Sequence, residues 1–394
     1  MEFGIFNSLY CPKAAVAAAP DPESVEHTRL LDEITWTRAA DRSGFKYTWA
    51  TEHHFLEEYS HLSANESFLA YLAGVTENIH LGSGIINITP PVNHPARVAE
   101  RVAMIDHLSG GRFEFGTGRG SSTTEQAGFG ITDPDLTKAM WAEALPQIVR
   151  MWAETDYSYE GEFFSMPSRN VLPKPLTRPH PPLWVAAGNP GTFETAARMG
   201  LGVLCFGISD PEALKPLIDI YKSNIGDAEP VGGYVNDNVM VTTQMLCLED
   251  GPRAKDIATR MTTGYHTSNL FRYLDTFPRP DGIPAWPALI PEPTLDQIEQ
   301  AVAHGLMAIG SPEEVDRCVA KYEATGADQL VFGMLSTTMP AEVAIEAVET
   351  FGRHLIPAYD KDPQHRTTTQ RDAQCPSSPP ARLLLPTAAG DERH

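Results

Sequence analysis

The chain lacks the paired cysteines that would mark a secreted, disulfide-linked protein. Its 394 residues contain only five cysteines, an odd number, and none of them has paired or Cys-X-X-Cys spacing. They are Cys11, Cys205, Cys247, Cys318 and Cys375. Dispersed cysteines in a chain of this length argue against a disulfide framework. They predict reduced thiols and a cytoplasmic location.

Long apolar runs and an excess of basic residues are missing as well. No run approaches the ~20 apolar residues that span a bilayer. The first residues, Met-Glu-Phe-Gly-Ile-Phe, predict a strand rather than a signal peptide, because no basic segment precedes a long apolar stretch. The 30 basic and 51 acidic residues give a net charge of −21, which repels phosphate backbones and anionic lipids. We therefore expect a soluble protein that binds neither nucleic acid nor membranes.

Short apolar strands alternate with amphipathic helical segments. The expected strands are 2–6, 45–50, 79–85, 112–116, 183–187, 202–206, 240–248 and 329–334. The expected helices are 27–43, 66–75, one that opens at Pro95, 136–152, 192–199, 211–222, one from about 253, and 341–355. Eight strand-helix units predict an α/β fold, a (β/α)8 TIM barrel that forms a single domain over residues 1–360. Two open sheets in tandem are the alternative, but no linker near the middle separates them.

Two stretches do not follow this alternation. Residues 261–325, before the last strand, are longer than one connection requires, and they combine aromatic residues with a proline-rich run. Such an insertion at a barrel mouth is typical of a lid, while packing away from the site is the alternative. Residues 361–394 show no helical or strand periodicity, and we expect a disordered C-terminal tail without a function.

The segment Thr51-Glu52-His53-His54-Phe55 directly follows the second expected strand. Parallel α/β folds place their chemistry at the carboxyl ends of the strands, and an imidazole exchanges protons near neutral pH. Adjacent residues of an extended segment point to opposite faces, so His53 and His54 do not converge on a metal ion. HExxH spacing is also absent. One inward imidazole acting as acid or base, or a histidine hydrogen-bonded within a loop, remain as alternatives.

Two glycine-rich turns follow later strands. The turn at 116–120 allows close approach of the backbone to a ligand, and Arg119 adds a fork suited to phosphate. The turn at 188–192 precedes a helix, whose free N–H groups and dipole favour an anion. A tight turn with a surface arginine and plain N-capping by Asn189 or Thr192 are the alternatives. A barrel places both turns and His53 on one rim, as expected for a phosphate-bearing cofactor with a reactive ring.

Taken together, these motifs resemble the bacterial-luciferase-like family of flavin-dependent monooxygenases. Residues 51–55 resemble the Glu-His-His-Phe segment of luciferase alpha chains. Residues 82–95 resemble the family's third strand and the following His-Pro helix entry, and 106–116 is similar to its fourth-strand signature. The similarity is clearest over 1–206 and returns at 310–315. It implies a TIM barrel that holds reduced FMN at its carboxyl mouth and oxygenates a small organic substrate with O2 through a C4a-peroxyflavin.

The resemblance also implies roles for single residues. His53 matches the active-site imidazole beside the flavin. His54 is the second catalytic candidate, but we expect it to hold the neighbouring residues in place rather than to exchange a proton. The peptide Gly84-Ile85 falls where the family often has a non-prolyl cis bond, and Arg119 matches a phosphate-contacting arginine. The implied cofactor contacts are Gly84, Ile85, Arg119, Lys138, Gly188, Asn189, Gly191 and Thr192.

Two departures and two rival functions accompany the resemblance. A second phosphate-contacting arginine of luciferase alpha chains aligns near Thr137-Lys138, where Lys138 is the expected substitute. Luciferase alpha chains have a cysteine near the flavin where this chain has Gly118, so light emission is not inferred. No GxGxxG motif is present, and reduced flavin is expected from a separate flavin reductase; the family implies a homodimer. The rivals are an F420-dependent hydride-transfer oxidoreductase and a non-catalytic flavin-binding subunit of a heterodimer. The Glu-His-His-Phe segment disfavours the first, and retention of His53 and Arg119 disfavours the second.

Overall fold

Eight parallel strands close into a barrel. The computed structural model describes residues 1–206, 210–276, 279–334 and 339–376. In order around the ring the barrel strands are β1 (Glu2–Asn7), β2 (Tyr47–Ala50), β3 (His80–Ser83), β5 (Phe113–Gly118), β8 (Leu183–Ala186), β9 (Gly202–Cys205), β10 (Val239–Cys247) and β12 (Gln329–Met334). The ring closes because β12 pairs in parallel with both β10 and β1. The predicted (β/α)8 barrel is confirmed.

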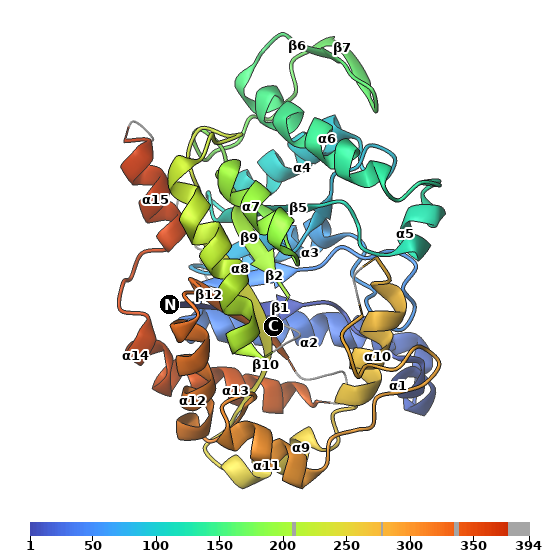
Figure 1. Cartoon of the computed structure of the whole chain (residues 1–394), viewed down its shortest axis with the longest axis vertical. Coiled ribbons are helices and arrows are strands. Elements are labelled where there is room, and N and C mark those ends of the chain that lie inside the picture. The colour runs from blue at the N-terminus through green and yellow to red at the C-terminus, as the bar shows by residue number, and fades with distance from the viewer. Residues whose placement is uncertain (207–209, 277–278, 335–338, 377–394) are drawn as a thin grey trace, which may run out of the picture.

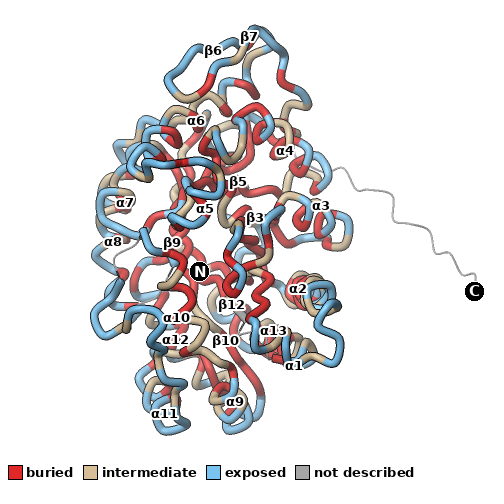
Figure 2. The backbone as a smooth tube through the Cα atoms, turned by 90° about the vertical axis from the view of Figure 1, so that its right-hand side faces the viewer, coloured by how far each residue is buried: buried red, intermediate tan, exposed pale blue. Residues whose placement is uncertain are grey.

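Helices surround the barrel, as Figure 1 shows. Those that follow the barrel strands are α2 (Val25–Arg42), α3 (Asn65–Val75), α4 (Pro95–Leu108), α6 (Leu136–Ala153), α7 (Pro190–Arg198), α8 (Pro211–Asn224), α9 (Gly251–Ala258) and α13 (Ala341–His354). Short helical turns add α1 (Lys13–Ala18), η1 (Pro22–Ser24), η2 (Ile225–Asp227) and α14 (Ile356–Tyr359). In Figure 2 the buried backbone concentrates in the strands and the inner sides of these helices. No helix within the described ranges is both long and apolar enough to cross a membrane.

Four strands were not expected from the sequence. The expected strand 79–85 ends early at Ser83, and the chain resumes as β4 (Ile86–Asn87), which pairs with the end of β5. A hairpin of β6 (Tyr157–Glu160) and β7 (Ser165–Arg169) pairs only with itself and projects from the barrel (Figure 1). The three-residue β11 (Ala308–Gly310) extends the sheet beside β10. Strands this short carry too few residues for a clear alternation.

The barrel interior is filled by two tryptophans facing glycines. Trp49 and Trp184 are fully buried, and their rings meet edge-on with centroids 5.2 Å apart. A Cβ on Gly82 would lie 2.2 Å from the Trp49 ring, and one on Gly202 would lie 2.4 Å from the Trp184 ring. The large side chains therefore fit only because the neighbouring strands have no side chain at these two positions.

Gly116 is expected to be the least replaceable glycine of the barrel. A Cβ there would lie 1.9 Å from the Ser83 carbonyl oxygen, which belongs to the backbone of β3 and cannot rotate away. We expect Gly116→Ala to lower the free energy of unfolding by about 3 kcal/mol or more, measured by urea denaturation. The control is Gly74→Ala in α3, where no atom lies within 4 Å and alanine favours the helix. Equal stability of the two variants would contradict this packing.

The amino-terminal end of the barrel is closed by the C-terminal segment. Residues 361–394 were expected to be disordered, but Arg366–Gln374 form α15, which packs across this end; residues 377–394 lie outside the described part. Thr367 in α15 donates to Glu114 Oε1 at 2.7 Å, and the ring of His365 stacks on His80 with centroids 3.6 Å apart. Periodicity missed this helix because its buried contacts are polar rather than apolar.

Glu114 is the centre of this closure. It is fully buried in β5 and accepts from Trp184 Nε1 at 2.7 Å, and its Oε1 lies 2.7 Å from His80 Nδ1. Burial raises the pKa of Glu114 to about 8, although the hydrogen bonds from Thr367 and Trp184 oppose the rise. Burial also holds the pKa of His80 well below its usual value. At neutral pH both groups are therefore uncharged in the folded protein.

A raised carboxyl pKa makes the stability of the fold depend on pH. At pH values between the unfolded and folded pKa, folded Glu114 keeps its proton whereas the unfolded residue has lost it. Its contribution to the free energy of unfolding is therefore complete below the unfolded pKa and is lost as pH rises through about 8. The folded pKa of His80 is depressed, so the contribution of His80 to the pH dependence of stability ends above the pKa of the unfolded histidine. Between pH 7 and 8 the free energy of unfolding should fall less steeply with pH in Glu114→Gln than in the wild type. We expect the two slopes to differ by up to about 1.4 kcal/mol per pH unit. Urea denaturation at several pH values measures this, and an unchanged slope would contradict a protonated Glu114.

Candidate active site

His53 lies in the loop after β2, at the carboxyl mouth of the barrel. Its Nδ1 is 3.2 Å from Oε1 of Glu125, which lies in α5 (Thr123–Gly128) after β5. The same oxygen accepts the backbone N–H of His54 at 2.7 Å. A carboxylate beside Nδ1 favours the tautomer with its proton there, and Nε2 remains available to exchange a proton. Among the described residues Nε2 has no hydrogen-bond partner.

His54 is also held by a carboxylate. Its Nε2 lies 3.2 Å from Oε1 of Glu52, and its ring meets Phe129 edge-on with centroids 4.8 Å apart. Burial lowers the pKa of His54, but the hydrogen bond and charge of Glu52 outweigh that effect, so the pKa lies above its usual value. Glu52 also accepts from Asn93 at 3.1 Å. His53 and His54 thus each have one carboxylate partner and one edge-on aromatic contact. The division into a catalytic His53 and a bracing His54 stays a prediction.

The Gly84-Ile85 peptide is cis and lies beside this loop. Asn65 Nδ2 donates to the carbonyls of Ile85 and Ala50, both at 3.1 Å, and thereby joins the ends of β2 and β3. A Cβ on Gly118 would lie 2.6 Å from Cδ1 of Ile85. The Ile85 side chain therefore fills the place beside Gly118, where the resemblance would put a cysteine.

Two cations lie on the rim at the end of β5 and the start of α6. Arg119 is exposed, and its Nη1 donates to the hydroxyl of Thr137 at 2.7 Å. Lys138, the next residue of α6, is also exposed. In the described part of the chain neither cation forms an ion pair with a carboxylate. Both charges therefore remain available to an anion.

The turn at 188–192 caps α7, which begins at Pro190. Oδ1 of Asn189 accepts from the backbone N–H of Thr192 at 3.1 Å and from its hydroxyl at 3.2 Å. This N-cap is the simpler of the two alternatives that the sequence offered, and it uses the N–H of Thr192. Gly188 and Gly191 are exposed. Because Thr117 of β5 pairs with Val185 of β8, Arg119 and Gly188 follow neighbouring strand ends. The turn and the cations therefore share one part of the rim.

Sequence reasoning missed three polar residues of the β5–α5 connection. Glu125 holds His53, and close to it the Ser122 hydroxyl and both polar atoms of the Gln126 amide are buried without a hydrogen-bond partner in the described chain. Buried polar groups are normally paired, so these orphans suit a polar ligand. The pattern Ser122-Thr123-Thr124-Glu125 was an available signal, because serine followed three residues later by glutamate marks a helix start.

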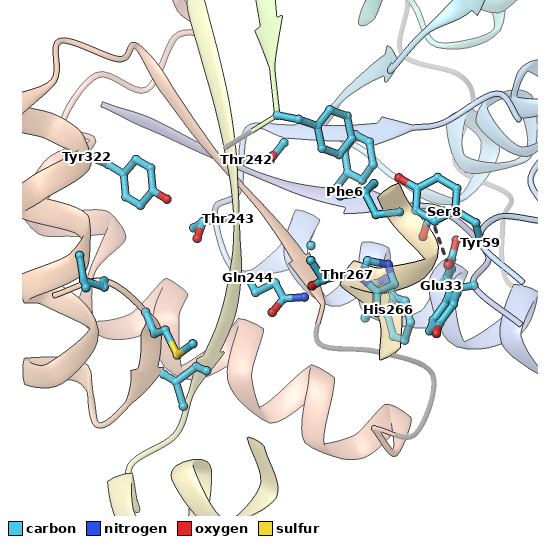
Figure 3. A pocket seen from close by; sticks show the side chains of 18 of the residues that line it. Phe6, Ser8, Glu33, Tyr59, Thr242, Thr243, Gln244, His266, Thr267 and Tyr322 are labelled. Carbon is cyan, nitrogen blue, oxygen red and sulfur yellow. Dashed lines mark hydrogen bonds between the residues drawn. The ribbon is translucent and has the colours of Figure 1, made fainter. Parts of the chain in front are cut away.

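A cavity of about 430 Å³ adjoins this site. Its wall includes Phe6, Glu33, Tyr59, Thr242 and His266 (Figure 3). Tyr59 connects it to the reaction site, because its ring centroid lies 5.1 Å from that of His53 and 5.9 Å from that of His266. Phe6 approaches from the other side, 3.2 Å from a Cβ placed on Gly84. The cavity therefore lies next to His53 and the cis peptide rather than beside the rim cations.

The helix α10 (Thr263–Tyr273) covers the mouth and belongs to the insertion 261–325. Its Leu270 packs in a buried cluster with Tyr59 from the His53 loop. Just after the helix, Asp275 accepts from the backbone N–H and the hydroxyl of Thr123, at 2.9 and 2.5 Å. The insertion therefore touches both loops that position His53 and Glu125. Its remaining regular elements are α11 (Leu295–Ala303), β11 and α12 (Pro312–Ala324).

A barrel with a carboxylate-held imidazole at its carboxyl mouth, an adjoining cavity and a covering helix is the architecture of a barrel enzyme. Residues 1–329 match the family of luciferase-like monooxygenases, and the chain belongs to this family. It is an oxidoreductase of the monooxygenase type.

Similar proteins are known over the full length and over parts of the chain. A protein of Sinorhizobium fredii named y4wF, uncharacterized, is 29% identical over 360 residues, which are 90% of this chain and 96% of that protein. The oxygenase component of a flavin-dependent trigonelline monooxygenase of Acinetobacter baylyi is 35% identical over 180 residues, 44% of this chain and 48% of that protein. The crystal structure of the monooxygenase RslO1 from Streptomyces bottropensis superposes with a TM-score of 0.75 at 25% identity, covering 91% of this chain and all of that one.

The family also contains enzymes that use a different flavin. An F420-dependent glucose-6-phosphate dehydrogenase of Kineococcus radiotolerans is 29% identical over 172 residues, 42% of this chain and 49% of that protein. Family membership by itself therefore leaves the cofactor open between FMN and F420.

Proposed function

We propose that this protein is a flavin-dependent monooxygenase that uses reduced FMN and O2 to oxygenate a small organic substrate. The observation that carries the proposal is His53, which Glu125 holds through Nδ1 and whose ring packs against Tyr59, a residue of the cavity wall. A monooxygenase needs a group that exchanges a proton with the substrate in a closed, dry site. A hydroxylation or a Baeyer–Villiger insertion would both meet this description.

The residues at the mouth fit a phosphate-bearing flavin. Arg119 and Lys138 offer cations without a carboxylate partner in the described chain, and the exposed turn at 188–192 adds backbone N–H groups at a helix start. Ser122 and Gln126 present buried unpartnered atoms to a polar ring edge. Bound FMN would supply the activation of oxygen, which no side chain can provide.

Each part of this chain would then have a separate task. His53 Nε2 would give or take the proton, and Glu125 would hold the imidazole in the right tautomer. The helix α10 would act as a lid that excludes water, because it joins the two loops that carry these residues. The chain carries no GxGxxG nucleotide motif, so a separate reductase would deliver reduced FMN.

Arg119 is expected to bind the phosphate of FMN. We expect Arg119→Ala to weaken FMN binding by about tenfold or more, the loss of one charge-assisted contact, and to leave riboflavin binding almost unchanged, because riboflavin has no phosphate. Flavin fluorescence titration measures both constants. The control is Arg169→Ala, since Arg169 lies in the projecting β7 and bonds only the Ser168 carbonyl within the described residues. Equal weakening of FMN and riboflavin would contradict the phosphate contact.

An experiment must distinguish FMN from F420 as the cofactor, and a catalytic chain from a non-catalytic flavin-binding subunit. The protein is titrated without oxygen with reduced FMN and, in parallel, with reduced F420; oxygen enriched in its heavy isotope is then added with a panel of organic substrates. We expect binding of reduced FMN, and heavy oxygen in the product detected by mass spectrometry.

Other outcomes would decide for the rivals. Tight F420 binding with hydride transfer and no heavy oxygen in any product would replace the proposal by the F420-dependent oxidoreductase. FMN binding without turnover of any substrate, restored by adding a second chain, would indicate the non-catalytic subunit of a heterodimer. Retention of His53 and Arg119 disfavours that second rival.

A further inference from the structure

The cavity contains a carboxyl group for which the proposed flavin chemistry has no use. Glu33 lies in α2, is 5% exposed and lines the cavity. Its Oε1 accepts the backbone N–H groups of Leu9 at 2.6 Å and of Ser8 at 3.4 Å; Figure 3 shows Glu33 beside Ser8. Its Oε2 is buried and has no partner among the described residues. One oxygen thus holds the loop after β1, and the other has nothing to bind within the protein.

The surroundings of Glu33 favour its neutral form. Burial raises the pKa of Glu33 to about 8, although the hydrogen bonds from Leu9 and Ser8 oppose the rise. The charged groups nearest on its own helix are Arg29 and Asp32, which pair with each other at 3.1 Å. The other ionisable groups that face it or line the cavity are Cys11, Tyr10, Tyr59, Asp210, His266 and Tyr322. At pH 7 the carboxyl keeps its proton, and because Oε1 accepts two N–H groups, that proton belongs on Oε2.

A second orphan group lies on the same wall. The Tyr10 hydroxyl is buried and has no partner in the described chain, and burial raises its pKa, so it also remains neutral. The Tyr10 ring packs edge-on against His266, with centroids 4.7 Å apart. Burial lowers the pKa of His266 to about 4, so this imidazole carries no charge at neutral pH. Glu33, Tyr10 and His266 therefore present neutral groups to the cavity, whereas Arg29 and Asp210 are the charged residues of its wall.

The rest of the wall is mainly apolar. It includes Phe6, Trp36, Phe206, Leu270, Met307 and Ile309. A volume of about 430 Å³ falls within the range of small-molecule pockets. Such a wall accepts a ring or a branched chain, and a buried unpaired donor rejects any ligand that leaves it unsatisfied.

We propose that Glu33 is a specificity-determining residue that donates a hydrogen bond from Oε2 to a neutral acceptor oxygen on a largely apolar substrate. The structure thereby assigns the substrate class: an apolar body that carries a carbonyl or a comparable uncharged oxygen. This inference rests on the proposed function only in taking the cavity as the substrate site. Binding alone tests it, without flavin turnover.

The experiment compares two probes of nearly equal shape, acetophenone and ethylbenzene, which differ in the carbonyl oxygen. Their affinities for the full-length protein are measured by quenching of tryptophan fluorescence, with and without oxidised FMN, because Trp36 lines the cavity. At pH 7 we expect acetophenone to bind about tenfold more tightly than ethylbenzene, which corresponds to about 1.4 kcal/mol. Above pH 8 the preference should disappear as Glu33 loses its proton.

Matched variants separate this role from a structural one. Glu33→Gln keeps an acceptor for Leu9 and a donor for the cavity, so it should keep the preference and lose its dependence on pH. Glu33→Leu should bind both probes equally, and near-ultraviolet circular dichroism checks that it remains folded. The control Glu57→Gln changes an exposed carboxylate, 69% accessible, and should behave as the wild type.

Two results would overturn the inference. One is equal affinity of wild-type protein for the two probes at pH 7. The other is tighter binding of phenyltrimethylammonium than of acetophenone, accompanied by proton release, because it would make Glu33 an anionic site for cations. Neither result depends on flavin binding. A failure of the FMN titration with a preserved carbonyl preference would instead reject the proposed function and leave this inference standing.

Discussion

Replacement of His53 by alanine is expected to lower the rate of substrate oxygenation by about a hundredfold to ten-thousandfold, the usual contribution of a positioned acid or base. The physical reason is the loss of the imidazole that Glu125 holds at the mouth, whose Nε2 has no partner within the described residues. FMN affinity should stay within about threefold, because His53 is not among the phosphate contacts. The measurement is a single turnover of reduced FMN, oxygen and the substrate identified by isotope incorporation, with product counted against hydrogen peroxide.

Two further variants show whether His53 itself acts. His54→Ala removes a histidine of similar burial that is bonded to Glu52, and we expect a much smaller loss. Glu125→Gln keeps a hydrogen-bond partner for His53 but removes the charge that fixes its tautomer, so the pH dependence of product formation should shift while FMN binding stays. Wild-type product yield in His53→Ala would remove the acid-base role.

Deletion of residues 362–394 is expected to cost about 3–5 kcal/mol of stability, because it removes two hydrogen bonds of the buried Lys46 ammonium, each worth about 1.5–3 kcal/mol. Lys46 loses two acceptors, the carbonyls of Asp362 and Gln364 at 2.7 and 2.6 Å, and retains the carboxylates of Glu2 at 2.8 Å and Asp360 at 3.0 Å. Glu114 loses the hydroxyl of Thr367. The free energy of unfolding is measured by urea denaturation at pH 7.

The matched control ends the chain at Pro376, after α15. It should have wild-type stability if the described helix alone closes the barrel. Thr367→Val in the full-length chain isolates the contact with Glu114 and should lose about 1 kcal/mol, the net value of one hydrogen bond. Equal stability of the chains ending at 361 and 376 would show that α15 contributes nothing to the fold.

Much of the fold follows from local patterns. The alternation of strands and helices needs only neighbouring residues, because the period of apolar side chains is set within one element. The segment after Trp49 therefore falls at a strand end, and the glycine turn at 188–192 also follows a strand. The turn expected at 116–120 begins later, because β5 continues to Gly118. The N-cap of α7 by Asn189 was likewise among the alternatives visible in the sequence, since a cap involves residues three apart.

The site depended on contacts that no local pattern contains. His53 and Glu125 are 72 residues apart, and Glu114 and Thr367 are 253 apart. The sequence offered no sign that α5 would hold an imidazole, that Glu33 would face a cavity, or that a polar tail segment would cover the barrel end. Such pairs arise from the paths of loops and from the closure of the ring.

The sequence by itself determined the barrel, the end of the barrel that carries chemistry, and the residue types available there. The tertiary structure decided which carboxylate holds each histidine, and which carboxyl groups stay protonated. The physical reason is that periodicity and turn chemistry act between neighbours, while burial sets protonation and is a property of the whole packed chain. Glu33, Glu114 and Glu125 are the same amino acid in the sequence, and their surroundings give them three different tasks.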